Sequence, residues 1–106
     1  MHLRVFVDAA GETQFSPLDL ATAPTGLTRS IFASRPAGSM QDWHNAASPM
    51  YIITLSGQME VEIEGGQRQR FGPGDVRLAE DTTGPGHISR VLGDEPWHFA
   101  VLIIDQ

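Results

Sequence analysis

Glycine-rich turns divide the chain into short apolar segments, and this spacing constrains the fold more than any other feature. From residue 40 onward, turn sequences occur about every ten residues, at 56–57, 65–66, 72–75 and 93–96. No segment keeps a helical hydrophobic period over more than about ten residues. Short strands at regular intervals are typical of antiparallel sandwiches and barrels. We therefore predict one all-β domain over residues 1–106, a length sufficient for a single core.

Residues 58–64 show the clearest strand pattern, because apolar and acidic side chains alternate without interruption. The number of glutamates in so short a segment, three, would by itself suggest a catalytic cluster. Their alternation places them on a single face of one strand. We therefore expect a solvated outer face that carries Glu60, Glu62 and Glu64.

The first 39 residues are less regular than the rest, and we expect them to form N-terminal strands and an arm outside the barrel motifs of residues 40–106. Strands are predicted at residues 3–7 and 27–33. Residues 8–26 are predicted to be irregular, with one helical turn near 16–20, where Ser16 suits the cap and Pro17 the first helical position.

Charge and residue usage exclude several classes of function. The net charge is −6 and the seven basic residues form no cluster, which argues against nucleic-acid binding and against a basic membrane-surface helix. Cysteine is absent, and all seven basic side chains are arginine, so thiol and lysine chemistry are excluded. No signal peptide or membrane-spanning run is recognisable, and we expect a cytoplasmic protein.

Two segments carry motifs of a known family. Gly38, His44 and Gly57 match the spacing of the first cupin motif, G-x5-H-x-H-x3–4-E-x6-G. The turn at residues 72–75, followed by a glycine-rich loop and His87, is similar to the second motif. The chain thus resembles small single-domain cupins. The resemblance implies a small antiparallel barrel of the jelly-roll, or double-stranded β-helix, type.

The resemblance also implies a metal site, but the sequence departs from the family's ligand set of three histidines and one glutamate. His44 and His87 match the first and third histidines, whereas Ala46 and Met50 occupy the other two positions. Ala46 has no donor atom, and a thioether is a poor ligand for iron, manganese, nickel or zinc. One weakly held divalent transition metal stays open as an alternative, with Asp42 as a third ligand.

His44 and His87 are also the best candidates for proton transfer, since imidazole changes its charge near neutral pH. Asp81, six residues before His87, is a candidate for orienting that ring. The competing interpretation is that both histidines are structural strand-end residues and that Asp81 only forms a turn.

The strand at residues 50–55 is predicted to supply part of a pocket. Met50, Ile52 and Thr54 share one of its faces. His98 is a further pocket candidate, although apolar residues on both sides of it leave its direction open. An apolar pocket of this kind suits a small organic ligand, such as an aromatic compound or a keto acid.

Three functions follow from these residues. The first is metal-independent acid–base catalysis of the isomerase, lyase or cyclase type, with His44, His87 and Asp81. The second is a metal-dependent cupin enzyme, such as a dioxygenase. The third is a ligand-binding module without catalysis. The resemblance also implies a homodimer in which the strand at residues 3–7 is exchanged between subunits.

Overall fold

Two facing β-sheets form the structure, which is a computed structural model describing residues 1–104. Within those residues there is no helix, and hence none that could cross a membrane. The all-β prediction is therefore confirmed. In chain order the strands are β1 (His2–Val7), β2 (Thr13–Pro17), β3 (Leu27–Arg35), β4 (Met40–His44), β5 (Met50–Ser56), β6 (Gln58–Ile63), β7 (Arg68–Phe71), β8 (Val76–Ala79), β9 (His87–Leu92) and β10 (Trp97–Ile104).

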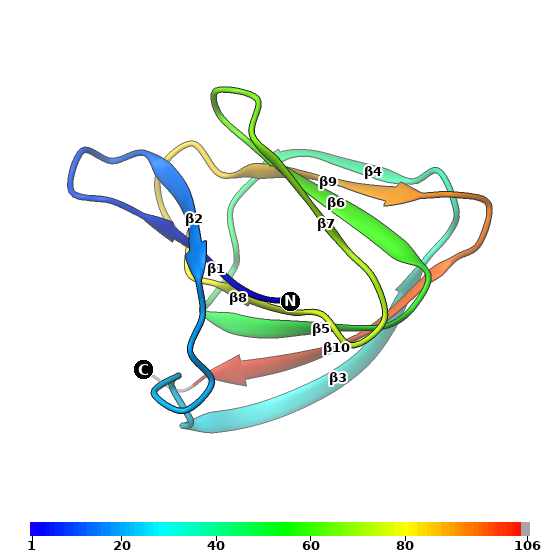
Figure 1. Ribbon diagram of the computed structural model, residues 1–106, viewed down its shortest axis with the longest axis horizontal. Helices are drawn as coiled ribbons and strands as arrows, with labels where there is room; N and C mark the ends of the chain where they lie inside the picture. Colours follow the sequence, from blue (N-terminus) through cyan, green and yellow to red (C-terminus); the bar gives the residue numbers. More distant parts are fainter. Residues whose placement is uncertain (105–106) are drawn as a thin grey trace.

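The larger sheet has the strand order β2-β1-β8-β5-β10-β3, and the smaller one has the order β4-β9-β6-β7. Figure 1 shows the smaller sheet across the top and β5, β10 and β3 below it, with an interior between them. Consecutive strands often lie in opposite sheets, as β3 and β4 do. All paired strands are antiparallel except β1 and β8, which run parallel. This arrangement is a jelly roll.

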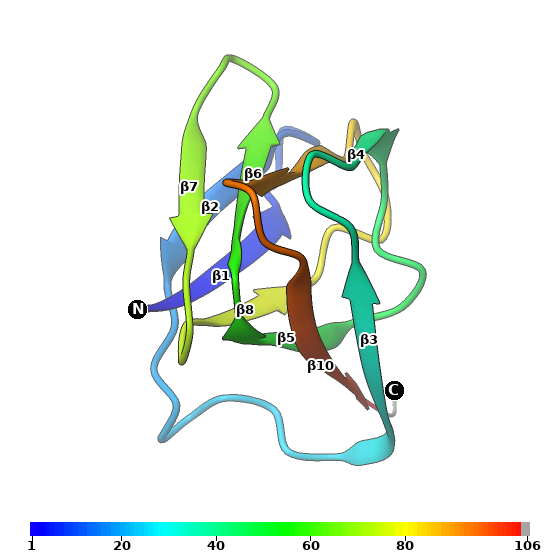
Figure 2. The ribbon, with the colours of Figure 1, turned by 90° about the vertical axis from the view of Figure 1, so that its right-hand side faces the viewer.

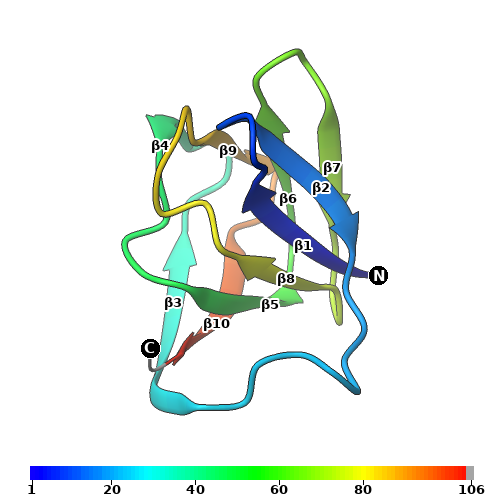
Figure 3. The same ribbon diagram turned by 90° about the vertical axis from the view of Figure 1, so that its left-hand side faces the viewer.

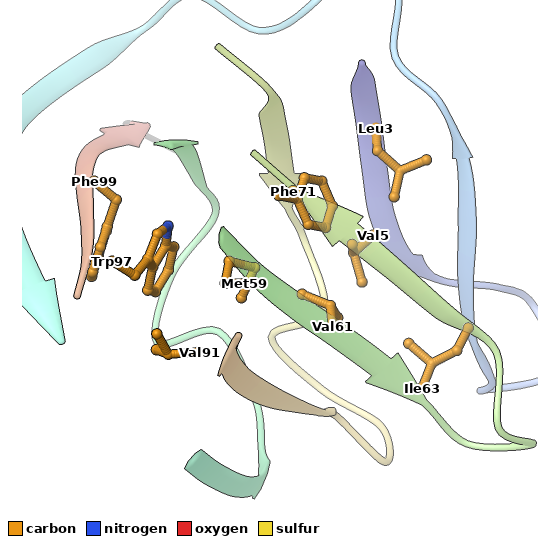
Figure 4. Close-up of a cluster of buried hydrophobic side chains, with 9 residues drawn as sticks. All are labelled: Leu3, Val5, Met59, Val61, Ile63, Phe71, Val91, Trp97 and Phe99. Carbon is orange, nitrogen blue, oxygen red and sulfur yellow. The ribbon is translucent and has the colours of Figure 1, made fainter. Parts of the chain in front are cut away.

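Apolar side chains from both sheets fill one part of the interior (Figure 4). The alternation predicted for residues 58–64 places three of them there, because every second side chain of β6 points inward. Removing such side chains from water is the main stabilising contribution to a fold of this kind. The cluster consists of Leu3, Val5, Met59, Val61, Ile63, Phe71, Val91, Trp97 and Phe99.

Residues 18–26 run from the end of β2 past β5 and β10 to β3 (Figure 3). A second, smaller cluster of buried side chains packs against this segment. Tyr51 and Leu78 are buried beneath this arm, and Leu18 packs against them. The Tyr51 hydroxyl donates a hydrogen bond of 2.5 Å to the Pro24 carbonyl. Residues 18–26 therefore form an arm without strands, which is held against the sheet by its buried side chains and by this hydrogen bond.

The segment before this arm was predicted incorrectly, because residues 13–17 form β2 rather than part of an irregular stretch that turns helical at 16–20. Backbone pairing with β1 explains the difference, since Ser16 and Pro17 lie opposite Arg4 and Leu3 in an antiparallel ladder. Tertiary pairing outweighs the weak local preference of a serine–proline pair for a helix start.

The four-stranded sheet, in which β6 lies beside β7 (Figure 2), carries an ion-pair network where a solvated acidic face was expected. Glu60 is only 4% exposed, because β7 and β9 flank β6 and place arginines around its carboxylate. Arg68, Arg70 and Arg90 each approach it at 3.3–3.6 Å. The strand alternation was predicted correctly, but the partners on neighbouring strands were not.

Candidate functional site

A cavity of about 270 Å³ lies between the two sheets, beside the packed core. Trp97 and Phe99 of β10 form its boundary with the core, and their rings stack with centroids 3.7 Å apart. Met50, Ile52 and Val101 add to its apolar lining. A ligand held here would lie mainly against hydrocarbon, with its polar groups met by a few defined side chains.

His44 and His87 both line this cavity and lie opposite each other in the pairing of β4 with β9. Their ring centroids are 4.4 Å apart and the ring planes are inclined by 59°. Gly86 permits this approach: its φ is +77°, and a Cβ there would overlap the His44 carbonyl oxygen. The glycine before His87 is thus what lets the two histidines meet.

His87 is nearly enclosed, at 3% exposure, and its Nδ1 is hydrogen-bonded to the fully buried Oδ2 of Asp81. A carboxylate only accepts, so Nδ1 carries the proton and Nε2 is left as the basic nitrogen. Burial lowers the pKa of His87, and this outweighs the opposing effect of the Asp81 hydrogen bond. The ring is therefore neutral at pH 7, with its tautomer set by Asp81.

His44 has the same tautomer for a different reason. Its Nδ1 lies 2.7 Å from the backbone carbonyl oxygen of Asp42, which can only accept a hydrogen bond. The Asp42 carboxylate, by contrast, is exposed and accepts from the Trp43 backbone N–H. It does not line the cavity. The structure therefore does not bring Asp42, the predicted third metal ligand, to the two histidines, because the pairing of β4 with β9 shifts between Gln41 and His44.

Sequence reasoning missed Asn45, which fixes the loop that carries Asp81. Its side-chain amide donates to the backbone carbonyls of Asp81, Thr83 and Gly84 at 3.0–3.3 Å. The next residue adds a backbone bond from the Ala46 N–H to the Asp81 carbonyl. The loop conformation, and with it the position of the Asp81 carboxylate, thus depends on the two residues that follow β4. No pattern within the sequence indicates this contact.

Two arginines in the cavity wall were also missed. Arg77 of β8 is 3% exposed and points inward beside Ile52, its partner on β5. Arg35 lines the cavity from the end of β3 and is half-buried. The one available signal for Arg77 was its position in the strand at 76–79, where an arginine is surrounded by apolar residues.

The other predicted pocket residues divide into two groups. Met50 and Ile52 line the cavity, as the alternation of β5 predicts. Thr54 lies on the same strand face but deeper, fully buried, where its Oγ1 accepts a hydrogen bond of 3.0 Å from the Trp97 indole. His98 is exposed on the outer side of β10. Thr54 and His98 are therefore not pocket residues, because β10 turns Trp97 and Phe99 inward instead.

The donor set does not fit a resident transition metal. His44 and His87 offer one free imidazole nitrogen each, and within residues 1–104 no group of three or more His, Cys, Asp or Glu side chains gathers. Asp81 is engaged behind His87, and the buried Arg77 cation lines the same cavity. A transition-metal site ordinarily needs at least three protein ligands and a negative or neutral surrounding.

Comparison with solved structures identifies the fold. The DMSP lyase DddQ from Ruegeria pomeroyi superposes with a TM-score of 0.59 at 22% identity over 77% of this chain, which spans 40% of DddQ. A Cupin 2 conserved barrel domain protein from Salinispora arenicola superposes with a TM-score of 0.59 at 18% identity, and the match covers 83% of this chain and 71% of that protein. KdgF from Halomonas sp. superposes with a TM-score of 0.56 at 22% identity, and the match covers 79% of this chain and 76% of KdgF.

Neither the protein-family models nor the curated proteins yield a match. The predicted cupin fold is nevertheless shown by the structural likeness. At these sequence identities the structural similarity shows the fold but says nothing about the reaction, which has to be argued from the site.

Proposed function

We propose that this small cupin binds an organic molecule between its two sheets and catalyses proton transfer on it, without a metal. The observation that carries the proposal is the buried Asp81–His87 pair, whose ring faces His44 in the cavity wall. Buried carboxylate–imidazole pairs of this geometry provide a base of defined tautomer.

His87 is the general base in this scheme. Its Nε2 takes a proton from a C–H or O–H group of the substrate, and the electron pair of that bond moves into the substrate. The imidazolium that forms is stabilised by the Asp81 carboxylate, which is already hydrogen-bonded to Nδ1. Because burial lowers the pKa of His87, the ring is in its basic form at neutral pH.

His44 is the general acid in its imidazolium form, in which Nδ1 keeps its proton toward the Asp42 carbonyl and Nε2 carries a second proton that passes to another atom of the substrate. Exchange with solvent then removes the proton taken up by His87 and reprotonates His44. Its ring lies 4.4 Å from that of His87, so both nitrogens serve one small molecule. Isomerisation, elimination, dehydration and cyclisation all need only these two proton movements. DddQ, which is named a DMSP lyase, has a similar fold.

Solvent deuterium exchange tests the proposal without knowledge of the complete reaction. Small keto acids and aromatic acids are incubated with the protein in D₂O, and loss of C–H signal is followed by proton NMR. Exchange is expected for at least one compound, with a fall of about a hundredfold or more in His87→Gln. Asp81→Asn should also slow exchange, because an amide does not stabilise the imidazolium.

A control variant separates these effects from loss of fold. His98→Gln makes the same chemical change at an exposed position outside the cavity, and should leave exchange intact. Saturable binding without exchange by any bound compound would contradict catalysis and leave a ligand-binding module. About one equivalent of metal in protein purified without chelator, lost on His44→Ala, would instead support the metal-dependent alternative.

The homodimer and the cytoplasmic location are also part of this proposal. In the structure β1 pairs with β2 and β8 of its own chain, and an exchanged dimer would make the same contacts between subunits. Sedimentation at micromolar concentration should give twice the 11.5 kDa chain mass. A single species at the chain mass would contradict it.

A further inference from the structure

The cavity differs in charge from the rest of the molecule. The whole chain carries a net charge of −6, with 13 acidic side chains. No Asp or Glu is among the residues that line the cavity, whereas Arg35 and Arg77 both are. A protein that is acidic overall therefore presents cationic groups to whatever enters this space, which favours an anion there.

Arg77 is the more informative of the two arginines, because it is buried and its guanidinium makes no hydrogen bond or ion pair among residues 1–104. It is 3% exposed, and its Nε and Nη1 are enclosed with no hydrogen-bond partner among residues 1–104. Buried guanidinium groups in proteins are normally paired with a carboxylate and hydrogen-bonded. Burial also lowers the pKa of Arg77, to about 10, which leaves the group charged at neutral pH.

Structural partners within the fold do not account for this position. Asp81 interacts with Arg77 through space, and its Oδ1 atom is also buried without a partner, while its Oδ2 atom is bonded to His87. No hydrogen bond or ion pair joins Asp81 to Arg77 among residues 1–104. The Phe71 ring lies 5.8 Å from the guanidinium carbon, at the far end of the range for a cation–π contact. Arg77 therefore contributes poorly to stability, which is typical of a residue kept for binding.

We propose that Arg77 is the anchor for the carboxylate of a small organic acid that binds in this cavity. A carboxylate carries one negative charge and accepts several hydrogen bonds, so it would pair with the charged guanidinium group of Arg77 where that group lines the cavity. The rest of the ligand would lie against Met50, Ile52 and Phe99, in a volume of about 270 Å³. That volume suits a carboxylate of a few carbons or one ring.

This inference rests on the proposed function for its position in the reaction. Arg77 projects from β8 in the larger sheet, and His87 from β9 in the smaller sheet, so both sheets contact one ligand. A molecule held by its carboxylate at Arg77 would present its remaining carbons to the histidine pair. Arg77 thereby determines which compounds are bound, and His44 and His87 act on them.

Binding of benzoate tests the proposal, with benzamide as the neutral compound of the same shape. Pyruvate and pyruvamide form a second pair without a ring. Affinities are measured by isothermal titration on the intact protein. At least one carboxylate is expected to bind at least about tenfold more tightly than its amide, since charge-assisted hydrogen bonds are the stronger ones. Arg77→Met should abolish this preference.

Two further measurements separate a binding role from a structural one. Arg77→Met replaces a buried cation by an apolar chain of similar length, so its melting temperature should equal or exceed that of the wild type. Arg29→Gln removes an exposed arginine outside the cavity and should leave binding unchanged. His87→Gln should keep the preference for the carboxylate while losing deuterium exchange.

Each outcome decides a different point. The role of Arg77 would be overturned by equal affinity for acid and amide, or by a preference that survives Arg77→Met. It would also be overturned if neither carboxylate binds at about 10 mM, which is about the weakest useful affinity. A fall in melting temperature of Arg77→Met, with binding retained, would assign Arg77 to the fold. Binding lost in Arg77→Met but no exchange in the wild type would uphold the anchor and refute catalysis.

Discussion

Substituting Gly86 by alanine tests the geometry that brings the two histidines together. Gly86 directly precedes His87 and has a φ of +77°. A Cβ at this position would overlap the His44 carbonyl oxygen and lie 2.7 Å from the carbonyl carbon. Even the longer of these contacts is well below the optimum of about 3.5 Å for nonbonded heavy atoms. The variant must therefore move β4 away from β9.

The expected cost has two parts. A left-handed backbone conformation costs a non-glycine residue about 1–2 kcal/mol, partly offset by the lower chain entropy of alanine in the unfolded state. The steric overlap adds about 1–3 kcal/mol, as overpacking does elsewhere in protein interiors. Gly93 separates these parts, since its φ is +76° and nothing lies within 4 Å of the position that a methyl group would take there. Gly93→Ala should carry the first cost alone.

Thermal unfolding of the two variants gives the comparison directly. In a domain of this size, 1 kcal/mol shifts the melting temperature by about 4–8 °C. Gly86→Ala should therefore melt at least about 4 °C below Gly93→Ala, with altered imidazole resonances of His44 and His87. Equal melting temperatures would refute the close approach of the two strands, and with it the argument that glycine is required beside His87.

Three further predictions concern the surroundings of the site. Burial lowers the pKa of His87, so below about pH 6.5 the unfolded chain binds more protons than the folded chain. The free energy of unfolding should therefore decrease as the pH is lowered through this range. His87→Gln should flatten this slope when denaturation is measured at several pH values. Glu60→Ala should lower the free energy of unfolding in urea by about 1–2 kcal/mol, because its carboxylate is buried among arginines. The control Glu64→Ala, at an exposed position, should lower it by less than about 0.5 kcal/mol. A similar loss for both would contradict the network. Asn45→Ala should cost about 0.5–1.5 kcal/mol and accelerate amide exchange in residues 80–86, since three carbonyls lose their donor. Unchanged exchange would show that the loop is held by other contacts.

Much of the fold follows from the sequence, because strand alternation and turn chemistry are local properties. The turns at residues 65–66 and 72–75 separate strands as predicted, and β6 buries Met59 and Ile63 on one face. The two-residue spacing of inward side chains similarly put Met50 and Ile52 in the cavity. The motif spacing around His44 and His87 was enough to indicate that they belong to one site.

Only the tertiary structure decided which groups surround that site, since those groups come from strands distant in the sequence. Pairing of β4 with β9 sets His44 against His87, 43 positions further along, and displaces Asp42 from the expected register. Burial is likewise a property of the assembled sheets. The apolar neighbours of Arg77 in the sequence do not by themselves place it in a cavity, and it becomes a buried cation in a cavity without acidic lining because both sheets close over it.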